Sequence, residues 1–180
     1  MFNNFEEFEL NLLGIENYQK DSDSRLRFWF NHIRNNALND DGDIFEFGVY
    51  RGSSLLAAAL ILKEMGSKKK VFGFDTFKGF PDFSKEDNLE NFYEYKDKNF
   101  SAEFITKFEK FKKLKNIITG LDDLNKVSIA SSGDFSETSY ELILKKIDYL
   151  KLDNIEIIKG SFSNTLENFF KENNCDINYL

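Results

Sequence analysis

Two carboxylates and two glycines form the part of this sequence with the clearest chemical meaning. Glu46 lies in a short apolar run, Gly48 and Gly52 follow it, and Asp75 ends a second apolar run. Sites for nucleoside-containing cofactors typically contain two successive parallel strands joined through a glycine turn and a helix. The second of these strands ends in an acidic residue. We therefore expect Glu46 to accept a hydrogen bond from an ammonium group, and Asp75 to bind ribose hydroxyls.

The glycine spacing indicates which cofactor is bound. The dinucleotide fingerprint G-x-G-x-x-G needs a second glycine so that the backbone can approach a pyrophosphate, and Tyr50 occupies that position here. S-adenosylmethionine (SAM) has no pyrophosphate, so a looser turn can bind it. The sequence thus favours SAM and disfavours a nucleotide-dependent oxidoreductase. A strand–glycine–helix turn also occurs in α/β proteins that bind nothing there, and this alternative stays open.

Apolar patterning predicts an α/β protein with a Rossmann-like, doubly wound and mostly parallel sheet that carries helices on both faces. We expect two parts, an N-terminal helical arm or cap over 1–40 and a SAM-binding domain over 41–180. The polar stretch 76–99 is either a lid or substrate loop, or a disordered insertion. The expected strands are 43–47, 71–75, 155–159 and a fourth from 176, and the expected helices are 21–38, 53–65, 101–113, one opened by Thr138 and one capped by Ser163.

Composition excludes several other classes of protein. The chain of 180 residues has a net charge of −7, which speaks against a nucleic-acid-binding protein. Its only cysteine, Cys175, and only histidine, His32, exclude an internal disulfide and a zinc or iron site built from these residues. The sequence shows no signal-peptide pattern and no membrane-spanning run, so we expect a cytoplasmic protein without membrane contact.

Three sequence blocks, 45–54, 71–81 and 158–166, together resemble the macrocin O-methyltransferase (TylF-like) family of class I SAM-dependent methyltransferases. The resemblance covers roughly residues 25 to 180. It implies methyl transfer from SAM to a sugar-type hydroxyl of a small molecule, assisted by magnesium. The cofactor-binding residues that it implies are Glu46, Gly48, Val49, Tyr50, Arg51, Gly52, Ser53, Asp75, Thr76, Phe77, Gly160, Ser161 and Phe162.

Members of this family place their metal ligands and catalytic base at or beyond an Asp-rich segment that follows the fourth strand. This chain ends at Leu180, before such a segment, so we expect a sheet truncated on its C-terminal side, no metal ligands and no assignable catalytic base. His32 is either a base or a surface or helix-packing histidine. The alternative to an enzyme is a non-catalytic SAM-binding or interaction domain, which could form a homodimer through its sheet edge.

Overall fold

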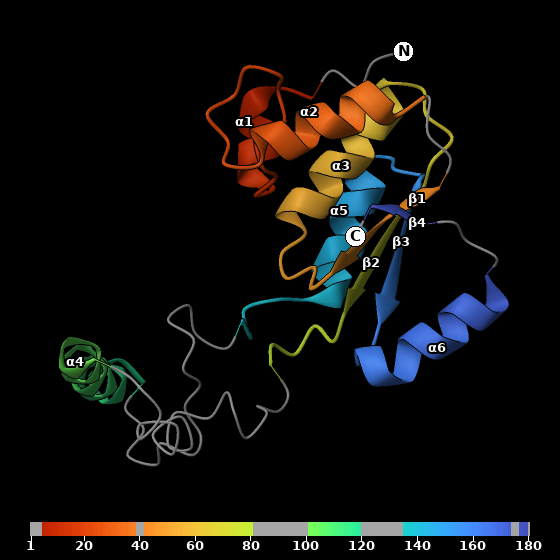
Figure 1. The fold of residues 1–180 in the computed structure, drawn as a ribbon. Helices are drawn as coiled ribbons and strands as arrows, with labels where there is room; N and C mark the ends of the chain where they lie inside the picture. The colour runs from red at the N-terminus through yellow and green to blue at the C-terminus, as the bar shows by residue number, and fades with distance from the viewer. Residues whose placement is uncertain (1–4, 39–41, 81–100, 120–134, 174–176, 180) are drawn as a thin grey trace. The chain divides into compact units, whose positions relative to one another are not determined.

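A computed structural model describes residues 5–38, 42–80, 101–119, 135–173 and 177–179 of the chain (Figure 1). The chain divides into two compact units, one formed by Met1–Gly79 with Glu137–Leu180 and the other by Phe80–Ser136. In the second unit the structure describes helix α4 (Ala102–Thr119), which is longer than predicted. The boundary expected after residue 40 stays a prediction, and most of the stretch 76–99 lies outside the described residues.

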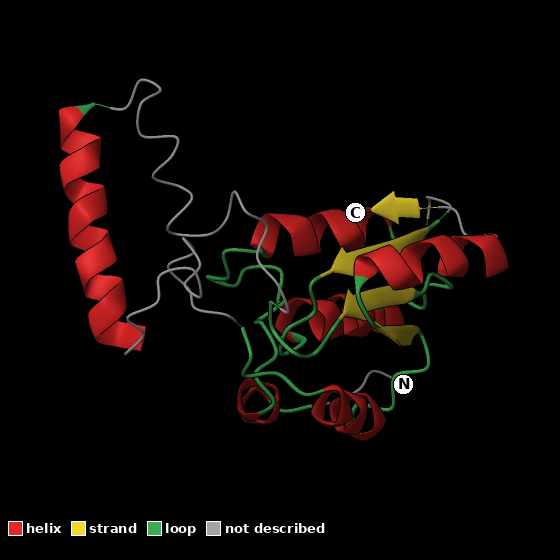
Figure 2. Cartoon of the chain, turned by 90° about the horizontal axis from the view of Figure 1, so that it is seen from below, coloured by secondary structure: helices red, strands yellow, loops and turns green. Residues whose placement is uncertain are grey.

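The first unit contains an open parallel sheet, as Figure 2 shows with its strands drawn as arrows. The strand order is β3-β2-β1-β4, and each pair of neighbours runs parallel. This confirms the predicted α/β, Rossmann-like fold, and the first three strands have the predicted bounds. The strands are β1 (Asp43–Phe47), β2 (Val71–Asp75), β3 (Ile155–Lys159) and β4 (Ile177–Tyr179).

Helices cover both faces of this sheet. From β1 through β2 to β3 the chain moves across the sheet in one direction, and from β3 to β4 it returns past β1. Because parallel connections are right-handed, the reversal places α6 on the opposite face from α3 and α5 (Figure 1). The helices of this unit are α1 (Glu7–Leu12), α2 (Arg27–Asn36), α3 (Ser53–Glu64), α5 (Tyr140–Tyr149) and α6 (Phe162–Glu172).

The two faces have different cores. On one face, α3 is buried along its whole apolar stretch from Leu55 to Leu62, as expected for a helix that is apolar on all sides. On the other face the core is aromatic: Phe45, Phe72 and Phe74 from the sheet pack against Phe169 of α6. The alternation of side chains along β1 therefore directs Glu46 to the α3 face and its neighbours Phe45 and Phe47 to the α6 face.

Two predicted helix starts are wrong. The N-cap of α5 is Ser139, whose hydroxyl accepts a hydrogen bond from the Leu142 N–H at 3.3 Å. Thr138 precedes this cap, and its hydroxyl donates to the carbonyl of Tyr50. Helix α6 begins directly after Ser161 rather than after the predicted cap Ser163. No helix among the described residues is long and apolar enough to cross a membrane.

Candidate functional site

The three sequence blocks meet at one edge of the sheet. They follow β1, β2 and β3, whose carboxyl ends lie side by side because the strands are parallel. Backbone hydrogen bonds join the loops there: the Gly48 N–H donates to the Phe74 carbonyl at 2.9 Å, and the Gly160 N–H donates to the Asp75 carbonyl at 2.9 Å. Ligands of open α/β sheets bind outside this edge, where the strand order reverses beside β1.

Glu46 is a largely buried carboxyl group at the end of β1. Its Oε1 accepts a hydrogen bond from the Ser54 hydroxyl at 2.9 Å. The residue beside it on β2 is Gly73, where the side chains of Leu55 and Val49 fill the space that a Cβ would occupy. Burial raises the pKa of Glu46 from 4.5 to about 7, and the bond from Ser54 opposes this rise. A ligand cation would stabilise the charged form, so Glu46 is suited to hold an ammonium group.

The turn between β1 and α3 depends on two glycines in the left-handed region. Gly48 has φ +95°, and a Cβ added there would meet no atom within 4 Å, so the backbone beside Glu46 borders open space. Gly52 has φ +75°, and a Cβ there would lie 2.8 Å from Cδ1 of Ile143. Gly52 therefore permits a close approach to α5.

Asp75 connects two loops through its side chain. Its Oδ2 accepts a hydrogen bond from the Tyr50 N–H at 2.7 Å, and its Oδ1 accepts one from the Phe77 N–H at 2.7 Å. Each carboxylate oxygen has a second lone pair, so the group retains capacity for two hydroxyl donors. Asp75 thus holds the loops in place and could also bind the two hydroxyls of a ribose.

Not every predicted side chain faces this edge. Val49 and Phe77 are buried in the core on the α3 face, so they can contribute only backbone atoms. The hydroxyl of Thr76 donates to the Gly79 carbonyl at 3.0 Å and closes its own loop. Arg51 is exposed and forms an ion pair with Glu137.

Sequence reasoning missed three residues around the site. Thr138 and Lys146 donate hydrogen bonds to the carbonyls of the turn, from positions far along the chain. Phe47 forms an edge-to-face pair with the predicted residue Phe162, with ring centroids 5.6 Å apart. No local motif identifies these residues, because their role arises from contacts that only the fold creates.

The other candidate groups lie elsewhere. His32 is exposed on α2, where the Asn36 amide donates to its backbone carbonyl at 2.9 Å. Cys175 lies outside the described residues. Within the described ranges, no group of three or more His, Cys, Asp or Glu side chains could hold a metal ion, so we derive no step through magnesium.

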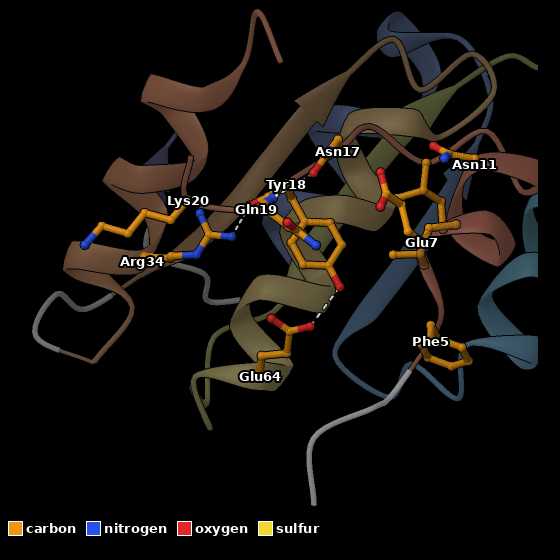
Figure 3. Close-up of a pocket in the computed structure, with 11 residues that line it drawn as sticks. Phe5, Glu7, Asn11, Asn17, Tyr18, Gln19, Lys20, Arg34 and Glu64 are labelled. Carbon is orange, nitrogen blue, oxygen red and sulfur yellow. Dashed lines mark hydrogen bonds between the residues drawn. The ribbon is translucent and has the colours of Figure 1, made fainter. Parts of the chain in front are cut away.

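A cavity of about 290 Å³ lies between the N-terminal arm and the far end of α3 (Figure 3). The Tyr18 hydroxyl points to Glu64 and donates to it at 2.7 Å, while Arg34 donates to the Tyr18 carbonyl. Burial raises the pKa of Tyr18. These polar groups are used to attach the arm to the C-terminal end of α3. The glycine turn lies at the N-terminal end of that helix, so the cavity is separate from the predicted cofactor site.

The chain has a Rossmann-like α/β fold, and its candidate site lies at the carboxyl ends of the strands. The family model described as Macrocin-O-methyltransferase (TylF) matches residues 23–174, and the chain belongs to this family. This finding confirms the resemblance seen in the three sequence blocks and places the chain among methyltransferases. A comparison with curated proteins found no match.

Proposed function

We propose that this protein is a SAM-dependent O-methyltransferase that acts on a sugar-type hydroxyl of a small molecule. Membership of the TylF family supports the reaction class. The observation that carries the cofactor assignment is the convergence of Glu46, Asp75 and the open glycine turn at one edge of the sheet.

The residues present fit SAM in their chemistry. The buried carboxyl of Glu46 matches the ammonium of the methionine part, and the N-terminus of α3, which has no side-chain cap, favours its carboxylate. Asp75 has lone pairs left for the ribose hydroxyls. The loop of Gly160, Ser161 and Phe162, which follows β3, would border the adenine.

When bound, SAM supplies a methyl group that its sulfonium makes electrophilic. The contribution of the protein is to hold the acceptor oxygen in line with that methyl group, which converts a bimolecular step into an effectively unimolecular one. The exposed Phe47 and Phe162 rings lie at the same edge and would give an acceptor an apolar surface. The hydroxyl proton must leave as the new carbon–oxygen bond forms, and we assign no described residue as its base.

The test is calorimetric titration with S-adenosylhomocysteine of the wild-type chain, Glu46→Gln and Asp75→Asn. We expect saturable binding by the wild type. Each variant keeps the size of the side chain and removes its charge, so each should weaken binding about tenfold or more, as expected for a lost hydrogen bond to a charged group. Glu172→Gln, an exposed change on α6, is the matched control and should bind like the wild type.

The outcomes separate the possible functions. A folded wild-type chain that does not bind S-adenosylhomocysteine would contradict the proposal. Binding that neither Glu46→Gln nor Asp75→Asn weakens would place the cofactor elsewhere. Binding without methyl transfer to any sugar-type hydroxyl would favour the alternative of a non-catalytic SAM-binding domain.

A further inference from the structure

The turn that follows β1 contains a non-glycine residue in a strained backbone conformation. Tyr50 has φ +52°, in the left-handed region that non-glycine residues rarely adopt. It stands between Gly48 and Gly52, which both have positive φ. Such a residue persists only where its surroundings hold it, and it is often found at ligand sites. The contacts that hold Tyr50 therefore bear on the site.

Hydrogen bonds fix this turn from both sides. On one side, the Tyr50 N–H donates to Oδ2 of Asp75 at 2.7 Å. On the other side, the Thr138 hydroxyl donates to the Tyr50 carbonyl, and the Lys146 ammonium donates to the Arg51 carbonyl at 3.0 Å. The peptide groups of the turn thus lie between the acid expected to bind ribose on one side and α5 with the segment that precedes it on the other.

The side chain of Arg51 strengthens the same connection. Its guanidinium pairs with the Glu137 carboxylate and donates through Nε to the Glu137 carbonyl at 3.1 Å. Glu137 directly precedes Thr138, so one short segment contacts both the backbone and the side chain of the turn.

Lys146 contacts the turn although burial of its ammonium group costs solvation. It is half-buried, and the desolvation, followed by the nearby charge of Arg51, lowers the pKa of its ammonium group. The interaction that the structure gives it is with a backbone carbonyl of the turn. An ammonium group partly removed from water for a carbonyl contributes little net stability, but it fixes where that carbonyl points.

We infer that Thr138 and Lys146 are positioning residues that hold the Tyr50–Arg51 turn, and through it the Asp75 carboxylate, in the arrangement that receives the cofactor. This inference rests on the proposed function, since it assumes that the cofactor binds at this edge. The Tyr50 carbonyl and the Tyr50 N–H belong to adjacent peptide groups that meet at the Tyr50 Cα. Release of the carbonyl would let Tyr50 leave its strained left-handed conformation, and its N–H would then no longer orient Asp75. The lone pairs of Asp75 would lose their fixed direction.

The test compares Thr138→Val with Thr138→Ser in calorimetric titrations with S-adenosylhomocysteine, well below the melting temperature of each variant. Valine has nearly the shape of threonine but no hydroxyl donor, so Thr138→Val should weaken binding roughly three- to tenfold. Serine restores the donor, so Thr138→Ser should bind within about twofold of the wild type. If the hydroxyl of Thr138 only stabilised the fold, Thr138→Val would bind as tightly as the wild type at temperatures where every variant is folded.

The matched control is Thr106→Val, which removes a hydroxyl donor to a backbone carbonyl, that of Ala102, within α4. It should leave the affinity unchanged. If Thr138→Val fails to fold, Lys146→Met tests the same inference, because methionine keeps the stem and removes the ammonium. The inference is overturned if folded Thr138→Val or Lys146→Met binds as tightly as the wild type, or if Thr106→Val weakens binding equally. Failure of the wild type to bind would instead overturn the proposed function, and the inference with it.

Discussion

At the scale of single residues, the two predicted acids of the site differ in their hydrogen-bond donors and in their burial. Asp75 receives backbone N–H donors on both oxygens, which fix its orientation. Glu46 accepts a hydrogen bond from the Ser54 hydroxyl and is largely buried, and burial raises its pKa to about 7. The charge of Glu46 therefore depends on pH in the neutral range and on whether a cation occupies the site.

This difference predicts a pH-dependent affinity. The ammonium of S-adenosylhomocysteine binds the ionised form of Glu46, so binding should strengthen as the pH rises from about 5.5 toward 8 and then level off. The limiting slope below pH 7 is about tenfold per pH unit, because one proton is released. Calorimetric titrations across this range should show the slope in the wild type and a nearly flat profile in Glu46→Gln. An equal slope in both would contradict the role of Glu46.

The same group acts on stability with the opposite sign. Because the pKa of Glu46 rises from 4.5 to about 7 on folding, the native state holds this proton more tightly than the unfolded chain. Its contribution to the free energy of unfolding therefore falls as the pH rises from 4.5 through 7. The protein keeps a costly buried carboxyl at this position, which is consistent with a role in binding rather than in folding.

At the scale of elements, the glycine turn is positioned by α5 as much as by its own strand and helix. A Cβ at Gly52 would lie 2.8 Å from Cδ1 of Ile143 and 3.3 Å from Cδ1 of Leu56. Gly66, just beyond α3, has a similar φ of +65° but no atom within 4 Å of such a Cβ. Substitutions at Gly66 and Gly52 therefore separate the cost of backbone strain, which both share, from the cost of steric overlap, which only Gly52 adds.

We expect Gly66→Ala to lower the free energy of unfolding by about 1–2 kcal/mol, the cost of a left-handed non-glycine residue. Gly52→Ala should cost about 1–3 kcal/mol more, because the added methyl group overpacks the contact with α5. Urea unfolding measures both values. Ile143→Val removes the overlapping methyl, so its cost should be smaller in the Gly52→Ala background than in the wild type. Equal losses of unfolding free energy in Gly52→Ala and Gly66→Ala would show that α5 moves to accommodate the added methyl group at no measurable cost.

At the scale of the whole molecule, the predicted cofactor residues all lie in the unit that contains the sheet. In that unit the reversal of strand order puts an aliphatic core under α3 and an aromatic core under α6. A ligand at the carboxyl edge contacts loops that lead into helices on both faces. Its binding free energy should therefore stabilise the unit as a whole.

Hydrogen exchange measures this coupling. With S-adenosylhomocysteine at about a hundred times its dissociation constant, the unit that contains the sheet gains about 2.7 kcal/mol against unfolding. Amides of β1, β2 and α3 that exchange by unfolding of this unit should slow by roughly a hundredfold under that linkage. Amides of α4, in the other unit, should not change if the site lies wholly within the first. Equal protection of α4 would show that the second unit contributes to binding.

Local patterns in the sequence predict the elements that form the sheet and its main helix. Short apolar runs predict β1, β2 and β3, and the all-apolar stretch of α3 predicts that this helix is buried. The three family blocks can also be recognised from the sequence, because the turns that form them are short and contiguous. The predicted starts of α5 and α6 are wrong, because neighbouring serines and threonines are all plausible N-caps.

How those elements act together depends on contacts that form only in the folded chain. The tertiary structure shows that Asp75 binds the turn as well as facing the site, and that Thr138 serves the turn rather than its own helix. It also gives Glu46 a pKa near 7 through burial. Each of these properties depends on residues far apart in the chain, whose proximity follows from the order of the strands. A local pattern carries no record of such contacts, because hydrogen bonding and desolvation depend on distance in space.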